Sequence, residues 1–193
     1  TKVVHGYSTL CAEDGRPMHK SWGNAIWFDD AAEEMGVDTM RWLFVNQKLD
    51  QNLLFGYNKA DEARRRFVIP FWNVYAFLVT YARIDAWTPP ETLSYNPSQL
   101  AEGQPHIADP WTEDAAPTVL DRWIIARLRE TIVAITEGME SYIPLKIAQP
   151  AEAFLDDLSN WYVRRSRRRF WAARGRDIGT DADKEAAYQT LYR

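Results

Sequence analysis

The sequence predicts a mainly α-helical protein, in which a short strand, loop and helix segment precedes an antiparallel helical bundle. Three observations support this fold class. Residues 2–11 combine β-branched and aromatic types, which favour a strand. Farther along, apolar residues recur every three or four positions over several long stretches, which is the spacing of one helix face. A chain of 193 residues that is 46% hydrophobic and 26% charged can also bury one sizeable core or two small ones.

The first region of the chain is predicted to be small and of mixed structure. Its strand is followed by Asp14-Gly15, a pair that favours a hairpin or a tight bend. Asp29 or Asp30 is the expected N-cap of a short helix, and Asp38 is the expected N-cap of the next one. The region is therefore expected to end in two short helices.

The second region is predicted to be the helical bundle, so that the chain divides into residues 1–57 and residues 58–193. Its helices are expected to begin near Asn58, Thr118 or Asp121, Pro144, and Asp181 or Asp183. Pro70 should kink or split the first of them, because proline lacks a backbone N–H. Apolar stripes run along three of the helices: Phe67, Phe71, Val74, Leu78 and Tyr81; Leu120, Ile124, Leu128, Ile132, Ile135 and Met139; Ala148, Ala151, Leu155, Leu158 and Tyr162. Such faces are buried only when the helices pack together.

Composition restricts the class of protein further. The net charge is −4, and no apolar run of about 18–20 residues stands out as a membrane span. The single cysteine, Cys11, excludes an internal disulfide and a zinc–cysteine cluster, which favours a reducing cytosol. The three histidines are scattered, so we expect no metal site. Because the chain opens in strand-like sequence and stops within a helical pattern, we expect it to be part of a longer protein.

The decapeptide GRPMHKSWGN, residues 15–24, places a histidine, a lysine and a serine side by side on a predicted loop. A lysine on a glycine-flanked loop is a mobile cation, and it can stabilise the negative charge that develops on a leaving pyrophosphate. Gly23 would let backbone amides approach phosphate. Taken alone, the pattern also fits chance, because a Lys-Ser pair beside a turn is common.

A basic run occupies residues 161–171, where the sequence WYVRRSRRRFW contains no acidic residue. At about 100° per residue, Arg164, Arg167 and Arg168 lie opposite the apolar stripe of their helix. A cationic face flanked by aromatic rings suits the phosphates of RNA.

Other members of this run have a second interpretation. Arg165 and Arg169 lie nearer the border of the apolar stripe, and they can instead pair with acids from another helix. Trp161 can stack on an RNA base, or it can pack inside the bundle.

Several stretches in succession resemble the isoleucyl-tRNA synthetases, which are class I aminoacyl-tRNA synthetases. The loop PMHKS, residues 17–21, is similar to the KMSKS signature of that family. It is followed by WGN, GVDTMR, RRRF, WNVY and LDRWI, at residues 22–24, 36–41, 64–67, 72–75 and 120–124. The most specific stretch is DLSNWYVRRSRRRFW, residues 157–171, where the valyl and leucyl relatives diverge. The resemblance covers the whole chain.

The resemblance implies a segment that runs from the end of the nucleotide-binding catalytic domain into the helical anticodon-binding domain. The full-length protein would be a cytoplasmic, monomeric ligase that uses ATP with Mg²⁺ to join isoleucine to tRNA(Ile). Lys20 would be the catalytic residue, stabilising the departure of pyrophosphate. The implied ATP-binding residues are His19, Lys20, Ser21 and Gly23. The implied tRNA-binding residues are Arg164, Arg165, Arg167, Arg168, Arg169 and Trp161.

The loop departs from the family signature at two positions. Pro17 replaces its first lysine and His19 replaces its first serine, so the loop carries one cation fewer. We expect the isolated segment to bind no cofactor and to be inactive. The alternatives are a free-standing tRNA-binding helical module, a helical scaffold for protein partners, and a valyl or leucyl relative.

Overall fold

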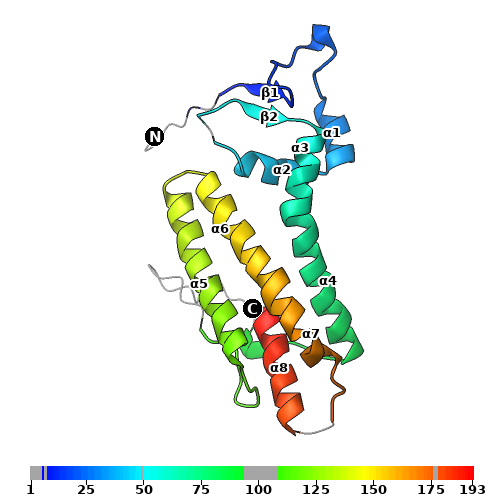
Figure 1. Cartoon of the computed structure of the whole chain (residues 1–193), viewed down its shortest axis with the longest axis vertical. Helices are drawn as coiled ribbons and strands as arrows, with labels where there is room; N and C mark the ends of the chain where they lie inside the picture. The colour runs from blue at the N-terminus through cyan, green and yellow to red at the C-terminus, as the bar shows by residue number, and fades with distance from the viewer. Residues whose placement is uncertain (1–5, 7, 49, 94–107, 176–177) are drawn as a thin grey trace. The chain divides into compact units, whose positions relative to one another are not determined.

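The computed structural model describes residues 6, 8–48, 50–93, 108–175 and 178–193, and it is mainly α-helical (Figure 1). Residue contacts divide the chain into two compact units. The first comprises residues 1–70 and 134–152, and the second comprises residues 71–133 and 153–193. The predicted division after residue 57 stays a prediction.

The first segment of the first unit, up to residue 70, contains two short parallel strands and three short α-helices among its described residues. Its elements are β1 (Leu10–Ala12), the 3-10 turn η1 (Lys20–Trp22), α1 (Phe28–Met35), α2 (Val37–Val45), β2 (Leu53–Phe55), α3 (Tyr57–Ala63) and the π-helical segment η2 (Arg64–Val68). Strand β1 lies at the end of the predicted strand, of which residues 2–5 and 7 lie outside the described residues. The predicted tight turn follows it, since Gly15 N donates to Ala12 O at 2.9 Å. The core of this unit consists of Ala31, Met35, Met40, Leu43, Phe55, Ala60 and Ala63.

The caps of α1 and α2 differ from the predicted ones. The N-cap residues are Trp27 and Gly36, and neither makes a side-chain capping hydrogen bond. The three aspartates lie in the first turns instead, at positions 29, 30 and 38. There a carboxylate interacts favourably with the positive end of the helix dipole, but it is not the N-cap residue. The predicted caps were therefore wrong by two or three positions.

The helix that follows is not split at Pro70, since residues 57–84 form one continuous helix with a π-helical segment just before the proline. Helix α3 continues through the π-helical segment η2 into α4 (Ile69–Ile84), and Pro70 lies in the first turn of α4. A π-helical turn has a wider hydrogen-bond spacing, which accommodates the ring and the missing N–H of a nearby proline.

The buried face of α4 is largely the predicted one. Val74, Leu78 and Tyr81 of the predicted stripe pack on the bundle core, and Phe77 joins them. Phe71, the first stripe residue on α4, is 58% exposed. The stripe prediction is therefore wrong at Phe71, and the stripe is buried from Val74 onward.

One stretch has the length and composition of a membrane span, contrary to the prediction from composition. It is the continuous helix Tyr57–Ile84, the one such stretch found among the described residues. Since one face of α4 contributes to the bundle core, we interpret the stretch as a bundle helix with an exposed apolar face.

The second unit is a bundle in which α4, α5, α7 and α8 alternate in direction, as predicted (Figure 1). The remaining elements of the chain are η3 (Glu91–Leu93), α5 (Val119–Glu140), α6 (Leu145–Asp156), the π-helical segment η5 (Asp157–Val163), α7 (Arg164–Trp171) and α8 (Ile178–Tyr192). Helix α8 begins three residues before the first predicted cap. Two clusters form the core, one around Trp87, Phe170 and Tyr188 and the other around Ile124, Tyr162 and Val163.

Candidate functional site

The loop that follows β1 has a closed conformation held by one side chain. Asn24 accepts a hydrogen bond from His19 N at 2.9 Å, and its Nδ2 donates to Pro17 O at 3.0 Å. Gly23 has a φ of +67° and donates its N–H to Lys20 O at 3.2 Å. A non-glycine residue rarely adopts this backbone conformation. Asn24 and Gly23 therefore fix the turn that presents the side chains between them.

The polar side chains of this loop face solvent. His19, Lys20 and Ser21 are exposed, as is Gly23. Lys20 Nζ lies 4.4 Å from the centroid of the Trp27 ring, and it forms no ion pair with any acid among the described residues. A cation–π contact at an exposed site contributes only about 0.5–1 kcal/mol, so the ammonium group is free to move to a phosphate.

Helix α7 is held in the second unit by a buried carboxylate. The Asp121 side chain is fully buried and accepts two hydrogen bonds from Arg169, both at 2.8 Å. Tyr162 Oη donates to the same carboxylate at 2.7 Å, and so do the N and Oγ1 of Thr118. Asp121 N donates in turn to Thr118 Oγ1 at 3.3 Å, which closes a capping box at the start of α5. Arg169 also pairs with Asp183 at 2.9 Å.

The pKa shifts in this network follow from burial and from the charges that it brings together. Burial raises the pKa of Asp121, but the hydrogen bonds from Arg169, Tyr162 and Thr118 outweigh burial and leave that pKa below its usual value. Burial and the neighbouring Asp121 charge hold the pKa of Tyr162 well above its usual value. Burial lowers the pKa of Arg169, but the partner carboxylates overcome burial and raise it. At neutral pH the pair is ionised and the phenol is neutral.

The network fixes the rotation of α7 about its axis. Ser166 and Phe170 are buried together with the Arg169 anchor, whose side chain is 12% exposed. The opposite side carries the exposed residues Arg164, Arg165, Arg167 and Arg168. None of these four forms an ion pair with an acid in the described part of the chain. We call them the α7 arginine surface.

A tryptophan borders the α7 arginine surface. Trp161 is 52% exposed, and Arg165 Cζ lies 5.7 Å from the centroid of its ring. The ring therefore braces a guanidinium group and still presents area to solvent. Trp171 is also exposed, but its Nε1 donates to Tyr81 Oη at 2.7 Å, which ties it to α4.

The structure divides the predicted tRNA-binding residues into two groups. Arg164, Arg167 and Arg168 are exposed, as helical spacing predicts, and Arg165 joins them. Arg169 pairs with acids from other helices, which is the alternative that the sequence left open. We therefore exclude Arg169 from the α7 arginine surface.

Sequence reasoning missed two residues that position these sites. Asn24 was quoted as part of a motif, but its role in closing the loop follows only from its two hydrogen bonds. Asp121 was expected as a possible helix start, whereas it also binds Arg169 across 48 residues of sequence. The spacing of Thr118 and Asp121 is a capping-box signal, and it could have indicated half of that role.

Comparison with known proteins identifies the family. Residues 121–193 match the family model described as the anticodon-binding domain of tRNA ligase. An isoleucine–tRNA ligase of Dehalococcoides mccartyi is 37% identical over 181 residues, or 93% of the chain. Those of Thermus thermophilus and Bacillus thuringiensis are 36% and 35% identical over 98% and 99% of the chain. The chain spans 16% of the length of each of these relatives. The sequence therefore places the chain in the isoleucyl-tRNA synthetase family, as the counterpart of a segment that includes the anticodon-binding domain.

Proposed function

We propose that this chain is the part of an isoleucine–tRNA ligase that binds tRNA through the α7 arginine surface and offers its loop of residues 17–24 to ATP. The observation that supports it most is the exposed group of four arginines without acidic partners in the described chain. This group lies inside the segment that matches the anticodon-binding domain. An arginine whose charge is not neutralised by the protein is available to a phosphate.

The α7 arginine surface has the chemistry of a backbone-binding site. Guanidinium groups bind phosphate oxygens through paired hydrogen bonds, and each neutralised phosphate releases condensed counterions. The partly exposed ring of Trp161 adds a face on which an unpaired base can stack. The surface therefore suits a folded RNA with an accessible loop, which agrees with tRNA(Ile) as the partner.

The loop supplies the second proposed role, which belongs to the full-length ligase. Lys20 would leave the Trp27 ring and contact the phosphates of ATP, stabilising the charge on the departing pyrophosphate. The exposed His19 and Ser21 would add hydrogen bonds to the same phosphates. Mg²⁺ bound with ATP would supply further positive charge there. Isoleucine activation needs more than these residues, so we propose that the isolated chain is inactive.

The buried cysteine fits a cytoplasmic protein. Cys11 is a free thiol with 1% of its surface exposed. A buried free thiol without a second cysteine for a disulfide is compatible with a reducing compartment.

Salt-dependent tRNA binding tests the first role. With four arginine–phosphate contacts, the logarithm of the binding constant should fall with the logarithm of salt concentration with a slope of about −3. The double variant Arg164→Glu and Arg168→Glu should weaken binding and reduce the slope toward about half that value. Filter binding of the 193-residue chain to tRNA measures both quantities.

A matched control separates the α7 arginine surface from general charge. Arg83 is exposed on α4 and forms no ion pair with an acid in the described ranges, so Arg83→Glu makes the same charge change as the single variant Arg164→Glu, with which it is compared. We expect a small effect on affinity and an unchanged slope. Equal losses for both variants would mean that tRNA is attracted by net charge alone.

Pyrophosphate exchange tests the second role in the full-length ligase. Lys20→Ala should lower the rate of isoleucine activation by about 10²–10³-fold and leave isoleucine binding nearly unchanged, because the contact forms mainly in the transition state. Arg16→Ala, on the same loop, is the control, since Arg16 is paired with Asp14 at 2.6 Å. An activation rate that Lys20→Ala does not change would exclude this role.

A further inference from the structure

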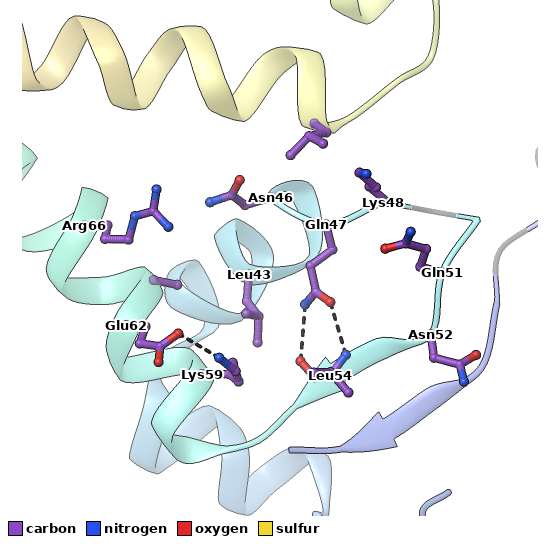
Figure 2. Close-up of a pocket in the computed structure, with 12 residues that line it drawn as sticks. Leu43, Asn46, Gln47, Lys48, Gln51, Asn52, Leu54, Lys59, Glu62 and Arg66 are labelled. Carbon is purple, nitrogen blue, oxygen red and sulfur yellow. Dashed lines mark hydrogen bonds and ion pairs between the residues drawn. The ribbon is translucent and has the colours of Figure 1, made fainter. Parts of the chain in front are cut away.

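A polar cavity of about 400 Å³ lies in the first unit, apart from the loop and the α7 arginine surface (Figure 2). Its walls come from the end of α2, the segment that leads into β2, and the start of the long helix α3–η2. Leu145, at the start of α6, contributes a further apolar contact. The cavity volume is within the usual range for small-molecule sites.

Several polar groups on the wall are already occupied by other parts of the unit. The Gln47 carboxamide makes two hydrogen bonds to the Leu54 backbone, at 3.3 and 3.1 Å, and so replaces a neighbouring strand at the edge of β2 (Figure 2). Lys59 pairs with Glu62 at 2.9 Å. Gln47 is therefore held by the backbone, and Lys59 is neutralised by Glu62, so neither is the group that would bind a ligand.

The same holds for the arginine on the wall. Arg66 pairs with Glu152 at 3.0 Å, and the other oxygen of Glu152 accepts hydrogen bonds from Trp42 Nε1 at 3.1 Å and Asn46 Nδ2 at 2.6 Å. The Glu152 carboxylate is therefore fully used, and it holds the Arg66 guanidinium in place.

Three polar side chains of the lining keep hydrogen-bonding capacity. Lys48 is exposed and forms no ion pair with the acids among the described residues, and the Gln51 side chain makes no hydrogen bond to them. Asn52 accepts a hydrogen bond from Ser8 through Oδ1 at 2.7 Å, which leaves its Nδ2 available as a donor. Lys48 and Gln51 are neighbours, since Gln51 N donates to Lys48 O at 3.4 Å, and Figure 2 shows both at one end of the cavity. The lining thus offers one cation, the Gln51 carboxamide beside it, and the Asn52 carboxamide.

We propose that this cavity binds a phosphorylated ribose. Lys48 would bind the phosphate, and the Gln51 and Asn52 carboxamides, which both donate and accept, would bind sugar hydroxyls. No aromatic ring is among the residues that line the cavity, so a nucleobase would find no stacking surface there. The sugar and phosphate are therefore the recognised part, whether they belong to the backbone of an RNA or to a free nucleotide.

Titration with ribose 5-phosphate tests this proposal and does not depend on the α7 arginine surface. The probe should bind to the 193-residue chain at least about tenfold more tightly than inorganic phosphate or ribose alone, since each of these lacks one half of the contacts. It should also shift the NMR signals of the Gln51 and Asn52 side-chain amides. Binding no tighter than that of phosphate would overturn the role of the carboxamides.

Matched lysine variants provide the control. Lys48→Glu should weaken ribose 5-phosphate binding at least about tenfold, because a charge-assisted hydrogen bond becomes a repulsion. Lys146→Glu makes the same charge change at an exposed position of the same unit, outside the lining, and should have no effect. Both lysines are exposed, so the variants should fold. Equal losses in the two variants would contradict the proposal.

Competition with tRNA identifies the source of the ligand. If the cavity holds the RNA backbone, tRNA displaces ribose 5-phosphate, and Lys48→Glu weakens tRNA binding in addition to any effect of the α7 variants. If it holds a free nucleotide, ribose 5-phosphate stays bound in the presence of tRNA. Both outcomes support the site, and a failure to bind ribose 5-phosphate at all excludes it without affecting the proposed tRNA-binding role of α7.

Discussion

Two arginine runs in this chain have nearly the same sequence, but their charges have different partners. Arg64 and Arg65 of the first run both pair with Asp61, and Arg66 pairs with Glu152. The second run, on α7, places a single arginine in buried ion pairs and leaves the four arginines of the α7 arginine surface exposed. Each run adjoins or lies within a π-helical segment.

The comparison shows that a basic run by itself does not indicate a nucleic-acid surface. Asp61 lies three and four positions before Arg64 and Arg65, which is the spacing at which helical side chains meet. Before α7, Asp156 ends α6 and Asp157 begins η5, about two turns from most of the arginines, and Asp157 pairs with Arg127 at 2.9 Å. The acids within reach, rather than the number of arginines, decide which run keeps its charge available.

The largest expected effect concerns the buried Asp121–Arg169 ion pair, which has no counterpart in the first run. Asp121→Asn should lower the free energy of unfolding by about 3 kcal/mol, because it removes the buried carboxylate that binds Arg169 and leaves Asp183 as its one acidic partner among the described residues. Asp109→Asn is the matched control. It removes the exposed pair with Arg129 and should cost less than about 1 kcal/mol. Chemical denaturation measures both, and similar losses would show that the buried pair does not hold α7.

The second effect is a dependence of stability on pH at both extremes. The folded pKa of Asp121 is lowered, so its contribution is present above the usual value of 3.8 and is lost as pH falls below it. The folded pKa of Tyr162 is raised, so above pH 10 the unfolded chain releases a proton that the folded chain keeps, and stability falls as pH rises.

Thermal unfolding across the pH range measures this dependence. Tyr162→Phe removes one titrating hydroxyl at a cost of about 1 kcal/mol near neutral pH and should reduce the alkaline loss. Part of the loss should remain, because burial and Asp85 also raise the pKa of Tyr188. An alkaline profile that is the same in this variant would contradict the assignment to Tyr162.

The smallest expected effect lies in the neutralised run. Arg65 is 74% exposed although it is paired, so Arg65→Ala should change the free energy of unfolding by less than about 1 kcal/mol. The affinity of the Arg65→Ala variant for tRNA should stay within about twofold of the affinity of the unmodified chain, since Asp61 already pairs with this arginine. A loss as large as that of an α7 variant would remove the distinction between the two runs.

Much of this arrangement could be predicted from local sequence. Helical spacing identified the bundle and the outward position of Arg164, Arg167 and Arg168, because these depend on neighbours within two turns. The spacing failed at Phe71, which is exposed although Val74 and Leu78 of the same stripe are packed on the core. Nothing in the residue pattern marks the two π-helical segments either. The partners of Arg169 could not be identified either, because Asp121 and Asp183 belong to other helices. The cavity beside Lys48 depends on segments that only the fold brings together.

The most direct test of the α7 arginine surface is site-specific photo-crosslinking of the chain to tRNA. A photoreactive residue placed at position 164 or 168 should crosslink to tRNA, and the same residue at position 65 should give little product at equal protein concentration. Competition with unlabelled tRNA should abolish the signal, whereas an unrelated polyanion should reduce it only at much higher concentration. Crosslinking at position 65 that equals or exceeds that at positions 164 and 168 would contradict our proposal that unpaired arginines on α7 bind the tRNA.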